Sequence, residues 1–261
     1  MNFPDGRGIP PLVMGILNVT PDSFSDGGKW NDRGDAVKHA LDMVQQGADV
    51  IDIGAESTRP GCIPVSADEE WARLEPVLRD LLPIIDVPVS VDTMKPEIAE
   101  KCISMGADII NDVNGFRAEG MMEACAGSDA VIVISHMYGD LSAMHEGCMG
   151  PDFKQEIKSF LDAQCAKAAD AGIPDDRIII DPGIGFGKTP EQNMEIIRDC
   201  SFLGTDHPIL IGVSRKRFVR TYYPDIDVDE ASARLSKMAV DSGAYMVRVH
   251  DVQRTVTSLR T

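Results

Sequence analysis

Eight short apolar runs, separated by longer helix-like segments, most strongly constrain the fold of this chain. The runs cover residues 12–17, 50–53, 89–91, 109–110, 131–134, 178–180, 209–213 and 246–249. Each run is almost continuously apolar, as expected for parallel strands that are covered on both faces. Eight strand–helix alternations within about 250 residues are typical of a TIM barrel rather than a doubly wound sheet. The sequence therefore predicts an α/β fold, a (β/α)8 barrel that forms a single domain over residues 1–261.

Helix signals fill the segments between the runs. Ser66 with Glu69, and Thr189 with Gln192, have the spacing of capping boxes and predict helices that start at residues 67 and 190. Gly47 has the position of a helix-terminating glycine. The other predicted helices cover residues 35–46, 229–242 and a short stretch after 252.

The net charge of −17 limits the chemistry of the ligand. Such an acidic chain is unsuited to binding a polyanion over its whole surface, so nucleic acid is not an expected partner. An anionic small substrate would need a local cationic cluster, because the rest of the surface repels it. One is present after the seventh and eighth runs: Arg215, Lys216, Arg217, Arg220, Arg248 and His250. TIM barrels commonly bind phosphate in these loops, although a solvated basic loop is the alternative interpretation.

The remaining composition points to a cytoplasmic protein. The six cysteines are scattered and form no Cys-x-x-Cys pair, which is typical of reduced thiols. The N-terminus has no apolar signal-peptide core, and no apolar stretch approaches the roughly 18 residues of a membrane span. The sequence therefore predicts no contact with a membrane.

Polar side chains follow every run at its carboxyl end. Any one of them could be a helix cap or a turn former. In a TIM barrel, however, these ends meet at one face, and a charge there is costly unless it is paired or binds a ligand. The long loops at residues 20–29 and 55–65 have the glycine and proline content of mobile lids. The positions predict one polar pocket: Asn18, Glu56, Ser57, Thr58, Arg59, Asp92, Asn111, Asp112, Ser135, His136, Asp181, Ser214, Arg215, Lys216, Arg248 and His250.

The segment DPGIGFGKT at residues 181–189 superficially resembles a phosphate-binding P-loop. Pro182 stands where the Walker pattern requires glycine, so the match fails. The segment is better interpreted as a glycine-rich loop that leads into a capped helix.

Several long motifs resemble those of the dihydropteroate synthases, in the order in which that family has them. They are MGILNVTPDSFSDGG at 14–28, DIGAESTRPG at 52–61, VSVDT at 89–93, GADIINDVNGF at 106–116, IIDPGIGFGKT at 179–189, GVSRK at 212–216 and RVHDV at 248–252. The resemblance implies a transferase that condenses (7,8-dihydropterin-6-yl)methyl diphosphate with an arylamine, p-aminobenzoate, and releases pyrophosphate. It also implies a Mg²⁺ cofactor and a homodimer.

The resemblance assigns the pterin pocket to Asp92, Asn111, Asp181, Met137 and Lys216. The carboxylate of Asp181 suits two charge-assisted hydrogen bonds from the pterin 2-amino group and ring N–H. The amide of Asn111 offers both a donor and an acceptor to a mixed edge. Met137 would flank the ring, with a plain core methionine as the alternative.

The resemblance divides the remaining residues between the diphosphate, the arylamine and a lid. Since Mg²⁺ keeps most of its waters and bridges phosphate oxygens, one protein ligand, Asn18, is expected. The implied mechanism is dissociative, so cations offset charge on the departing pyrophosphate and no protein nucleophile is needed. The diphosphate residues are Asn18, Thr58, Arg248 and His250; the arylamine residues are Thr58, Arg59, Pro60, Phe186 and Arg217; the lid residues are Asp22 and Asp26; the catalytic residues are Lys216, Arg248, His250 and Asp92.

One departure from the family pattern concerns the acceptor. Bacterial members usually have serine after Ser-Arg-Lys, where this chain has Arg217. Arg217, with Arg220, is suited to extra negative charge on the acceptor, such as the ribofuranosyl-aminobenzene phosphate used by archaeal relatives. The alternative is that Arg217 contacts the p-aminobenzoate carboxylate or solvent. Two other functions stay open: a methyltetrahydrofolate–corrinoid methyltransferase, which needs no diphosphate site, and a non-catalytic pterin-binding protein.

Overall fold

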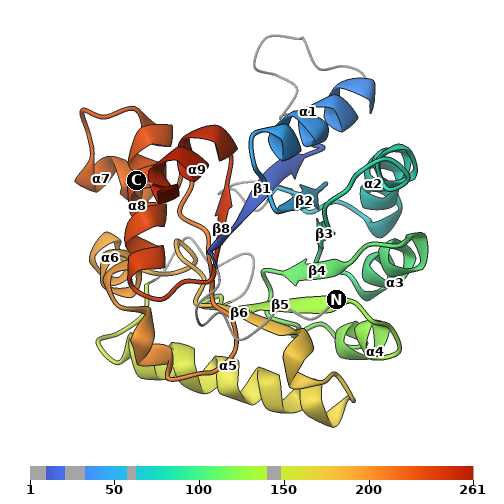
Figure 1. Cartoon of the computed structure of the whole chain (residues 1–261). Coiled ribbons are helices and arrows are strands. Elements are labelled where there is room, and N and C mark those ends of the chain that lie inside the picture. Colours follow the sequence, from blue (N-terminus) through green and yellow to red (C-terminus); the bar gives the residue numbers. More distant parts are fainter. Residues whose placement is uncertain (1–9, 21–32, 58–62, 140–147, 261) are drawn as a thin grey trace.

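The structure is a computed structural model, and it describes residues 10–20, 33–57, 63–139 and 148–260. Within these ranges the chain forms eight parallel strands, and Figure 1 shows the helices arranged around them. The strands are β1 (Leu12–Asn18), β2 (Val50–Gly54), β3 (Val89–Asp92), β4 (Ile109–Asp112), β5 (Val131–Ser135), β6 (Ile178–Asp181), β7 (Leu210–Ile211) and β8 (Met246–Val249).

The strands close into a barrel. Their order is β6-β5-β4-β3-β2-β1-β8-β7. The two ends of this order meet where Ile180 and Ile209 form a parallel bridge and the Ile180 N–H donates to the Pro208 carbonyl at 3.0 Å. The predicted (β/α)8 barrel is therefore confirmed.

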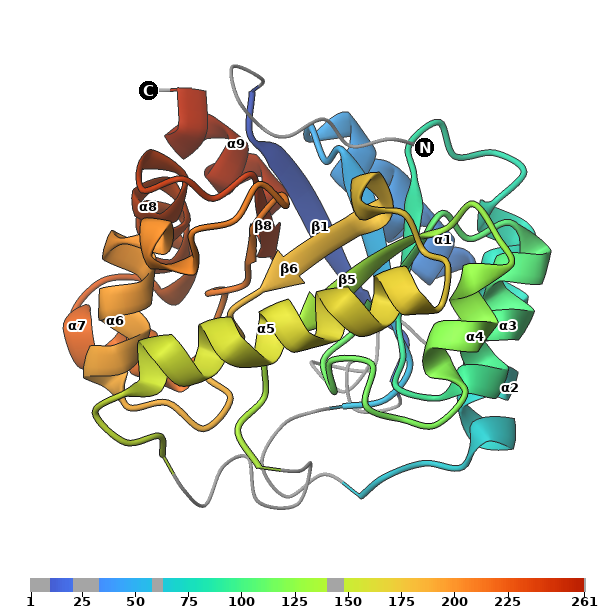
Figure 2. The ribbon, with the colours of Figure 1, turned by 90° about the horizontal axis from the view of Figure 1, so that it is seen from below.

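The helices form an outer layer around the barrel. Figure 2 shows the 18-residue α5 lying along the outside of the strands, where it packs against β5. Among the described residues, no helix is long and apolar enough to cross a membrane. The helices are α1 (Arg33–Gln45), α2 (Ala67–Leu81), α3 (Pro96–Met105), α4 (Met121–Ala126), α5 (Phe153–Asp170), α6 (Pro190–Arg198), α7 (Arg217–Tyr222), α8 (Val228–Asp241) and α9 (Val252–Arg260), with 3-10 turns at η2 (Asp175–Arg177) and η3 (Cys200–Leu203).

Local sequence signals fix several helix starts. At α6, the Thr189 hydroxyl accepts from the Gln192 N–H at 3.2 Å and the Gln192 side chain accepts from the Thr189 N–H at 3.0 Å. This capping box satisfies two N–H groups that have no partner inside the helix. At α2, Ser66 accepts from the Glu69 N–H at 3.2 Å, whereas the Glu69 carboxylate pairs with Arg73 instead of completing the box.

The seventh strand is shorter than the sequence predicts. Residues 209–213 were expected as a strand, and β7 covers Leu210–Ile211 alone. The chain turns directly afterwards, because the Lys216 N–H donates to the Val213 carbonyl at 3.2 Å. The turn brings residues 214–216 back over the mouth of the barrel.

The barrel interior is filled by an inner core. Its side chains come from seven of the eight strands and from the residue before β8, and they are almost completely buried. Successive side chains of a strand point to opposite faces, so the alternate residues pack outward against the helices. The inner core consists of Met14, Val50, Ile109, Val131, Val133, Ile179, Leu210, Tyr245 and Met246.

Candidate active site

Polar side chains lie directly above the inner core, at its carboxyl end. Residues two and four positions after an inward apolar residue also point inward, because side chains alternate along a strand. Counted from the inner core, at least one of these two positions is polar or glycine on each of the seven strands that contribute to it. These positions include Asn18, Asp52, Gly54, Asn111, Ser135, Asp181, Gly212, Ser214, Arg248 and His250.

Four positions at or next to the carboxyl ends of β1, β2, β3 and β4 align across the barrel wall. Asn18 pairs in register with Gly54, Gly54 with Asp92, and Asp92 with Asn111. A Cβ at Gly54 would lie 3.5 Å from the Asp92 Cβ and 3.8 Å from Asn18 Oδ1. Glycine therefore leaves open the space between the Asn18 amide and the Asp92 carboxylate.

Arg248 ties this layer together. Its guanidinium lies 2.6 Å from Asp52 Oδ2 and 2.8 Å from Asp92 Oδ2. Asp52 is fully buried, and its carboxylate also accepts from the Ser90 hydroxyl at 2.6 Å and from the Asn111 amide at 3.4 Å. A buried carboxylate needs this set of partners, since an unpaired one would be strongly destabilising.

Asp52 and Ser90 are site residues that our sequence analysis missed. Both lie within their strands, two residues before Gly54, the end of β2, and Asp92, the end of β3. The signal was available, because an aspartate within a buried strand must face a cation.

The carboxyl groups in this layer have unusual pKa values. Burial raises the pKa of Asp92 to about 7, against the opposing effect of the Arg248 guanidinium. Burial also raises the pKa of Asp181, which the Lys216 ammonium opposes. Perturbed carboxyl groups that converge with cations are typical of functional sites.

Two buried polar atoms in the layer have no hydrogen-bond partner among the described residues. They are Asn111 Oδ1 and Ser135 Oγ. Asn111 is 2% exposed, so bulk solvent does not reach this oxygen. Buried acceptors are rarely left unsatisfied, and such an atom in a site is suited to a ligand donor.

The glycine-rich loop after β6 is held from below by Lys188. Its ammonium lies 3.0 Å from His136 Nδ1 and donates to the carbonyls of Gly183 at 2.8 Å and Phe186 at 3.2 Å. Burial lowers the pKa of Lys188 to about 7, while the nearby Asp181 raises it. Gly183 has φ +71°, and a Cβ there would lie 1.7 Å from the His136 carbonyl oxygen, so this contact requires glycine.

An apolar cluster lies beside this loop. It consists of Val113, Met137 and Phe186, with the half-buried Met94 packed against them. Each comes from a different loop that follows β3, β4, β5 or β6. Apolar side chains of this kind suit contact with a flat ring, and Met94 and Val113 were not predicted.

Lys216 lies against the apolar cluster. Its ammonium lies 4.3 Å from the centroid of the Phe186 ring and donates to the Ile184 carbonyl. A Cβ at Gly185 would lie 2.8 Å from the Lys216 side chain, so glycine makes room for it. Burial lowers the pKa of Lys216 to about 8, which Asp181 opposes.

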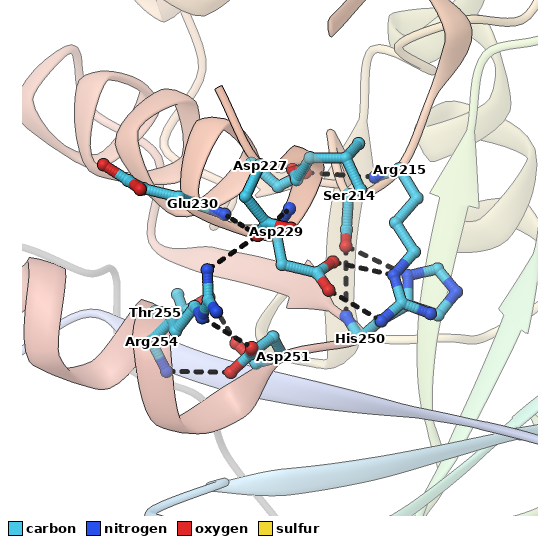
Figure 3. A network of polar contacts seen from close by, with 11 residues as sticks. Ser214, Arg215, Asp227, Asp229, Glu230, His250, Asp251, Arg254 and Thr255 are labelled. Atoms are coloured by element: carbon cyan, nitrogen blue, oxygen red, sulfur yellow. Dashed lines mark hydrogen bonds and ion pairs between the residues drawn. The ribbon is translucent and has the colours of Figure 1, made fainter. Parts of the chain in front are cut away.

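His250 lies at the rim on the β8 side, where Figure 3 shows it beside Ser214. The Ser214 hydroxyl accepts from the His250 N–H at 3.1 Å, and it lies 3.0 Å from His250 Nδ1. This contact fits either ring tautomer, because the hydroxyl can donate to a bare Nδ1 or accept from Nδ1–H.

The predicted cationic cluster is divided in the structure. Lys216, Arg248 and His250 lie at the site, whereas the Arg215 guanidinium pairs bidentately with Asp229 at 2.7 and 2.8 Å (Figure 3). Arg217 begins α7 and is exposed. The hydrogen-bonding edge of the Arg215 guanidinium is therefore occupied by a carboxylate of the protein itself.

Asp112 also lies outside the pocket. It is one residue past the inward Asn111, so the alternation along β4 turns it to the outer face. There its carboxylate accepts from the N–H groups of Asn114 and Phe116, both at 2.7 Å. It stabilises its own loop, and burial raises its pKa to about 7.

The structure thus brings most predicted site residues together. Asp92, Asn111 and Arg248 contact one another directly or through Asp52. The charge of Lys216 opposes the rise in the pKa of Asp181. Lys216 also contacts Phe186 of the apolar cluster, which includes Met137. Five predicted residues lie outside the described ranges: Asp22, Asp26, Thr58, Arg59 and Pro60.

Comparisons with known proteins agree on one family. A family model described as pterin binding enzyme matches residues 14–250. The dihydropteroate synthase of Escherichia coli K12 is 40% identical over 253 residues, which is 96% of this chain and 90% of that protein.

Solved structures give the same result. A Xanthomonas albilineans dihydropteroate synthase with 4-aminobenzoic acid has a TM-score of 0.89 at 39% identity and covers 96% of this chain and 91% of that one. A Burkholderia cenocepacia dihydropteroate synthase complexed with 7,8-dihydropteroate has a TM-score of 0.87 at 38% identity and covers 96% and 89%.

Proposed function

This chain belongs to the dihydropteroate synthases among the pterin-binding enzymes, and we propose which of its residues carry each part of that reaction. It condenses (7,8-dihydropterin-6-yl)methyl diphosphate with p-aminobenzoate and releases pyrophosphate. The observation that best supports this assignment of residues is the buried Asn111 Oδ1, which has no partner among the described residues and lies in a layer with Asp92 and Arg248. That layer offers polar groups to a heterocycle and cations to its leaving group.

We assign pterin binding to Asp92, Asn111, Asp181, Met137 and Lys216. The Asp181 carboxylate accepts from the 2-amino group and a ring N–H, and Asn111 Oδ1 gains the donor that it lacks in the described structure. Met137 and the other residues of the apolar cluster contact the faces of the pterin ring. Lys216, above Phe186, covers the remaining side.

We assign diphosphate binding to Asn18, Arg248 and His250, with Thr58 from the second loop. Asn18 supplies one neutral amide oxygen beside Asp92, which fits a Mg²⁺ ion that is bound mainly through substrate phosphate oxygens and water. When bound, Mg²⁺ would withdraw charge from the phosphate oxygens. In the described ranges, no three His, Cys, Asp or Glu side chains form a metal site of their own.

The chemistry needs no covalent intermediate on the protein. The bond between the pterin methylene carbon and the diphosphate oxygen breaks, and its electron pair leaves with pyrophosphate. Lys216, Arg248 and His250 offset the developing negative charge. The Asp92 carboxylate stabilises the cationic methylene carbon, the arylamine nitrogen forms the new C–N bond, and its proton goes to solvent.

The relatives favour p-aminobenzoate as the acceptor. Solved relatives are described with 4-aminobenzoic acid and with 7,8-dihydropteroate. The phosphorylated acceptor and the corrinoid methyltransferase gain no support from these comparisons. We assign the arylamine to Phe186, Arg217 and the second-loop residues Thr58, Arg59 and Pro60, with Asp22 and Asp26 in the lid.

A direct assay tests the function. With pterin diphosphate, p-aminobenzoate and Mg²⁺, the protein should form dihydropteroate and pyrophosphate in equal amounts. Release of pyrophosphate without the condensed product would contradict the assignment, and so would methyl transfer from methyltetrahydrofolate to a corrinoid.

Arg217→Ala should raise the KM for p-aminobenzoate by about 3- to 10-fold and leave kcat unchanged. An exposed charge-assisted hydrogen bond to the acceptor carboxylate supplies an effect of this size. An arylamine without a carboxylate should show no change in KM, which initial-rate kinetics can measure. Arg198→Ala, an exposed arginine at the end of α6, is the control. Equal losses with both amines would contradict a role in carboxylate recognition.

The rate should fall at alkaline pH as Lys216 loses its proton. Its pKa is lowered to about 8 by burial, so kcat/KM should fall about tenfold per pH unit well above that value. Lys216→Arg keeps the charge and should move this alkaline limb to higher pH. Lys237→Arg, an exposed lysine of α8, should keep the wild-type profile. An unmoved limb in Lys216→Arg would assign the titration to another group, such as Lys188.

The proposal also covers the oligomeric state, the cellular compartment and the substrates. The sequence resemblance supports a homodimer, which solution scattering can test. The described cysteines Cys102, Cys125, Cys148, Cys165 and Cys200 are free, which supports a reducing cytoplasm. The substrates are small molecules, as in the relatives.

A further inference from the structure

Arg215 has an unusual backbone conformation. Its φ is +58°, in the left-handed region that a residue with a Cβ adopts at an energetic cost. Among the described residues, one other non-glycine residue, Phe116, has a positive φ. Both lie in loops that follow the carboxyl ends of strands, β7 and β4, where the active site is built. Strained residues persist only where their surroundings hold them in place, and they concentrate at functional sites.

Helix α8 holds Arg215 in this conformation. The two Asp229 oxygens accept from Arg215 Nε at 2.7 Å and Nη2 at 2.8 Å, and the Arg215 N–H donates to the Ser232 hydroxyl at 3.1 Å. Ser232 in turn donates to the Val228 carbonyl at 2.6 Å, so its oxygen is fixed by the helix. Figure 3 shows Asp229 reaching from α8 to Arg215. Both the side chain and the backbone of Arg215 are therefore clamped.

The second strained residue is held in a comparable way. The Phe116 N–H donates to Asp112 Oδ2 at 2.7 Å. In both loops an aspartate carboxylate accepts from the strained residue, from the backbone N–H of Phe116 in one and from the guanidinium of Arg215 in the other.

The two neighbours of Arg215 both contact the site. Ser214, on one side, hydrogen-bonds His250 through the ring Nδ1 and the backbone N–H. Lys216, on the other, reaches the Ile184 carbonyl and the Phe186 ring. The backbone angle of Arg215 therefore sets the position of Lys216 relative to His250, two side chains that we propose act on the departing pyrophosphate.

We propose that Asp229 is a positioning residue, which clamps Arg215 in the left-handed conformation and thereby aims Lys216 and His250 at the leaving diphosphate. This inference rests on the proposed function. The Asp229 pKa is lowered, mainly by its hydrogen bond from Arg215, so the clamp is charged at neutral pH. The competing interpretation is that Arg215 itself binds the anion, although its guanidinium is committed to Asp229.

Two substitutions of one residue separate these interpretations. Arg215→Ala removes the ion pair but keeps a Cβ, so its backbone leaves the left-handed region. Arg215→Gly removes the same ion pair, but glycine adopts a positive φ without cost. We expect kcat to fall about 10- to 100-fold in Arg215→Ala and to stay within about threefold of wild type in Arg215→Gly. The KM for p-aminobenzoate should not change in either variant.

Asp229 should show the complementary pattern. Asp229→Asn weakens the clamp and should lower kcat about 3- to 30-fold in the wild-type background. In the Arg215→Gly background it should have almost no effect, because no clamp remains to be lost. Arg234→Ala, which breaks an exposed ion pair with Glu230 on the same helix, is the matched control and should retain wild-type kcat.

A second readout does not depend on turnover. Nitrogen NMR of the His250 ring should show the same protonation pattern of the two ring nitrogens in wild type and in Arg215→Gly, and a different tautomer pattern in Arg215→Ala, where the Ser214 contact changes. Equal losses of kcat in Arg215→Gly and Arg215→Ala would overturn the proposal in favour of a direct role of the guanidinium. Equal activity of both variants with wild type would overturn it as well. Absence of condensation by the wild type would instead contradict the proposed function, and the tautomer pattern would still decide the clamp.

Discussion

Asp181→Asn is expected to weaken pterin binding about 100- to 1,000-fold. The carboxylate is assigned two charge-assisted hydrogen bonds from the pterin, and losing their charge costs about 3–4 kcal/mol. The loss is large because an asparagine whose oxygen keeps the 2.7 Å bond from the Gly183 N–H turns its NH2 group toward the pterin donors. Calorimetric titration with a 6-substituted pterin measures the change.

Stability separates this effect from unfolding. The Asp181 carboxyl is buried and its pKa is raised, so replacing it with a neutral amide should not lower the melting temperature. Asp199→Asn, an exposed aspartate at the end of α6, should bind pterin as the wild type does. Normal pterin affinity in a folded Asp181→Asn protein would remove Asp181 from the pocket.

The sequence contained most of the fold because parallel barrels repeat one simple pattern. Each buried strand appeared as an apolar run, and the capping residues at Ser66 and Thr189 located helix starts to the residue. The end of β7 could not be predicted, since it depends on the turn in which Lys216 bonds back to Val213. Composition alone does not distinguish an apolar strand end from an apolar turn.

The site was predictable where a polar residue stands at or next to the end of a strand. Asn18 and Asp92 end β1 and β3, Asn111 is the last residue but one of β4, and their register shows that they align. Asp52 was not predicted because it lies within β2 and not at its end. The alternation of side chains nevertheless turns it inward, two residues before Gly54. The same alternation would have excluded Asp112 from the pocket.

Charge pairing was the part that no local pattern could supply. Arg215 and Lys216 are adjacent cations in the sequence, and only the fold shows that one meets Asp229 on α8 while the other meets the pocket. The choice depends on a helix that begins 12 residues after Lys216. Ion pairs between separate elements are set by tertiary geometry, so a basic run in a sequence overstates the number of cations available to a ligand.

Arg248→Met should destabilise the fold and abolish most turnover. Its guanidinium is the cation for the fully buried Asp52 and for Asp92. Removing one partner of a buried ion pair costs about 3–5 kcal/mol, because a charge is left uncompensated. For a chain of this size the melting temperature should fall by about 6–20 °C. Without the guanidinium, kcat should also fall at least about 100-fold, as expected for a lost group that stabilises a leaving anion.

A double variant separates the two losses. In Asp52→Asn with Arg248→Met the buried cluster loses one charge of each sign, so the free energy of unfolding should recover by about half or more, while turnover stays low. Arg254→Met breaks exposed pairs with Asp227 and Asp251 and should cost less than about 1 kcal/mol.

The pH dependence identifies the cause of the instability in Arg248→Met. An uncompensated buried carboxylate has a raised pKa, so the folded state takes up protons more readily than the unfolded chain as pH falls. The stability deficit of Arg248→Met relative to wild type should therefore be smaller at pH 5 than at pH 8, which urea unfolding at the two pH values measures. The Asp52→Asn double variant should reduce that pH dependence. A deficit that is equal at both pH values would mean that lost packing of the arginine side chain, and not the uncompensated charge, destabilises the barrel.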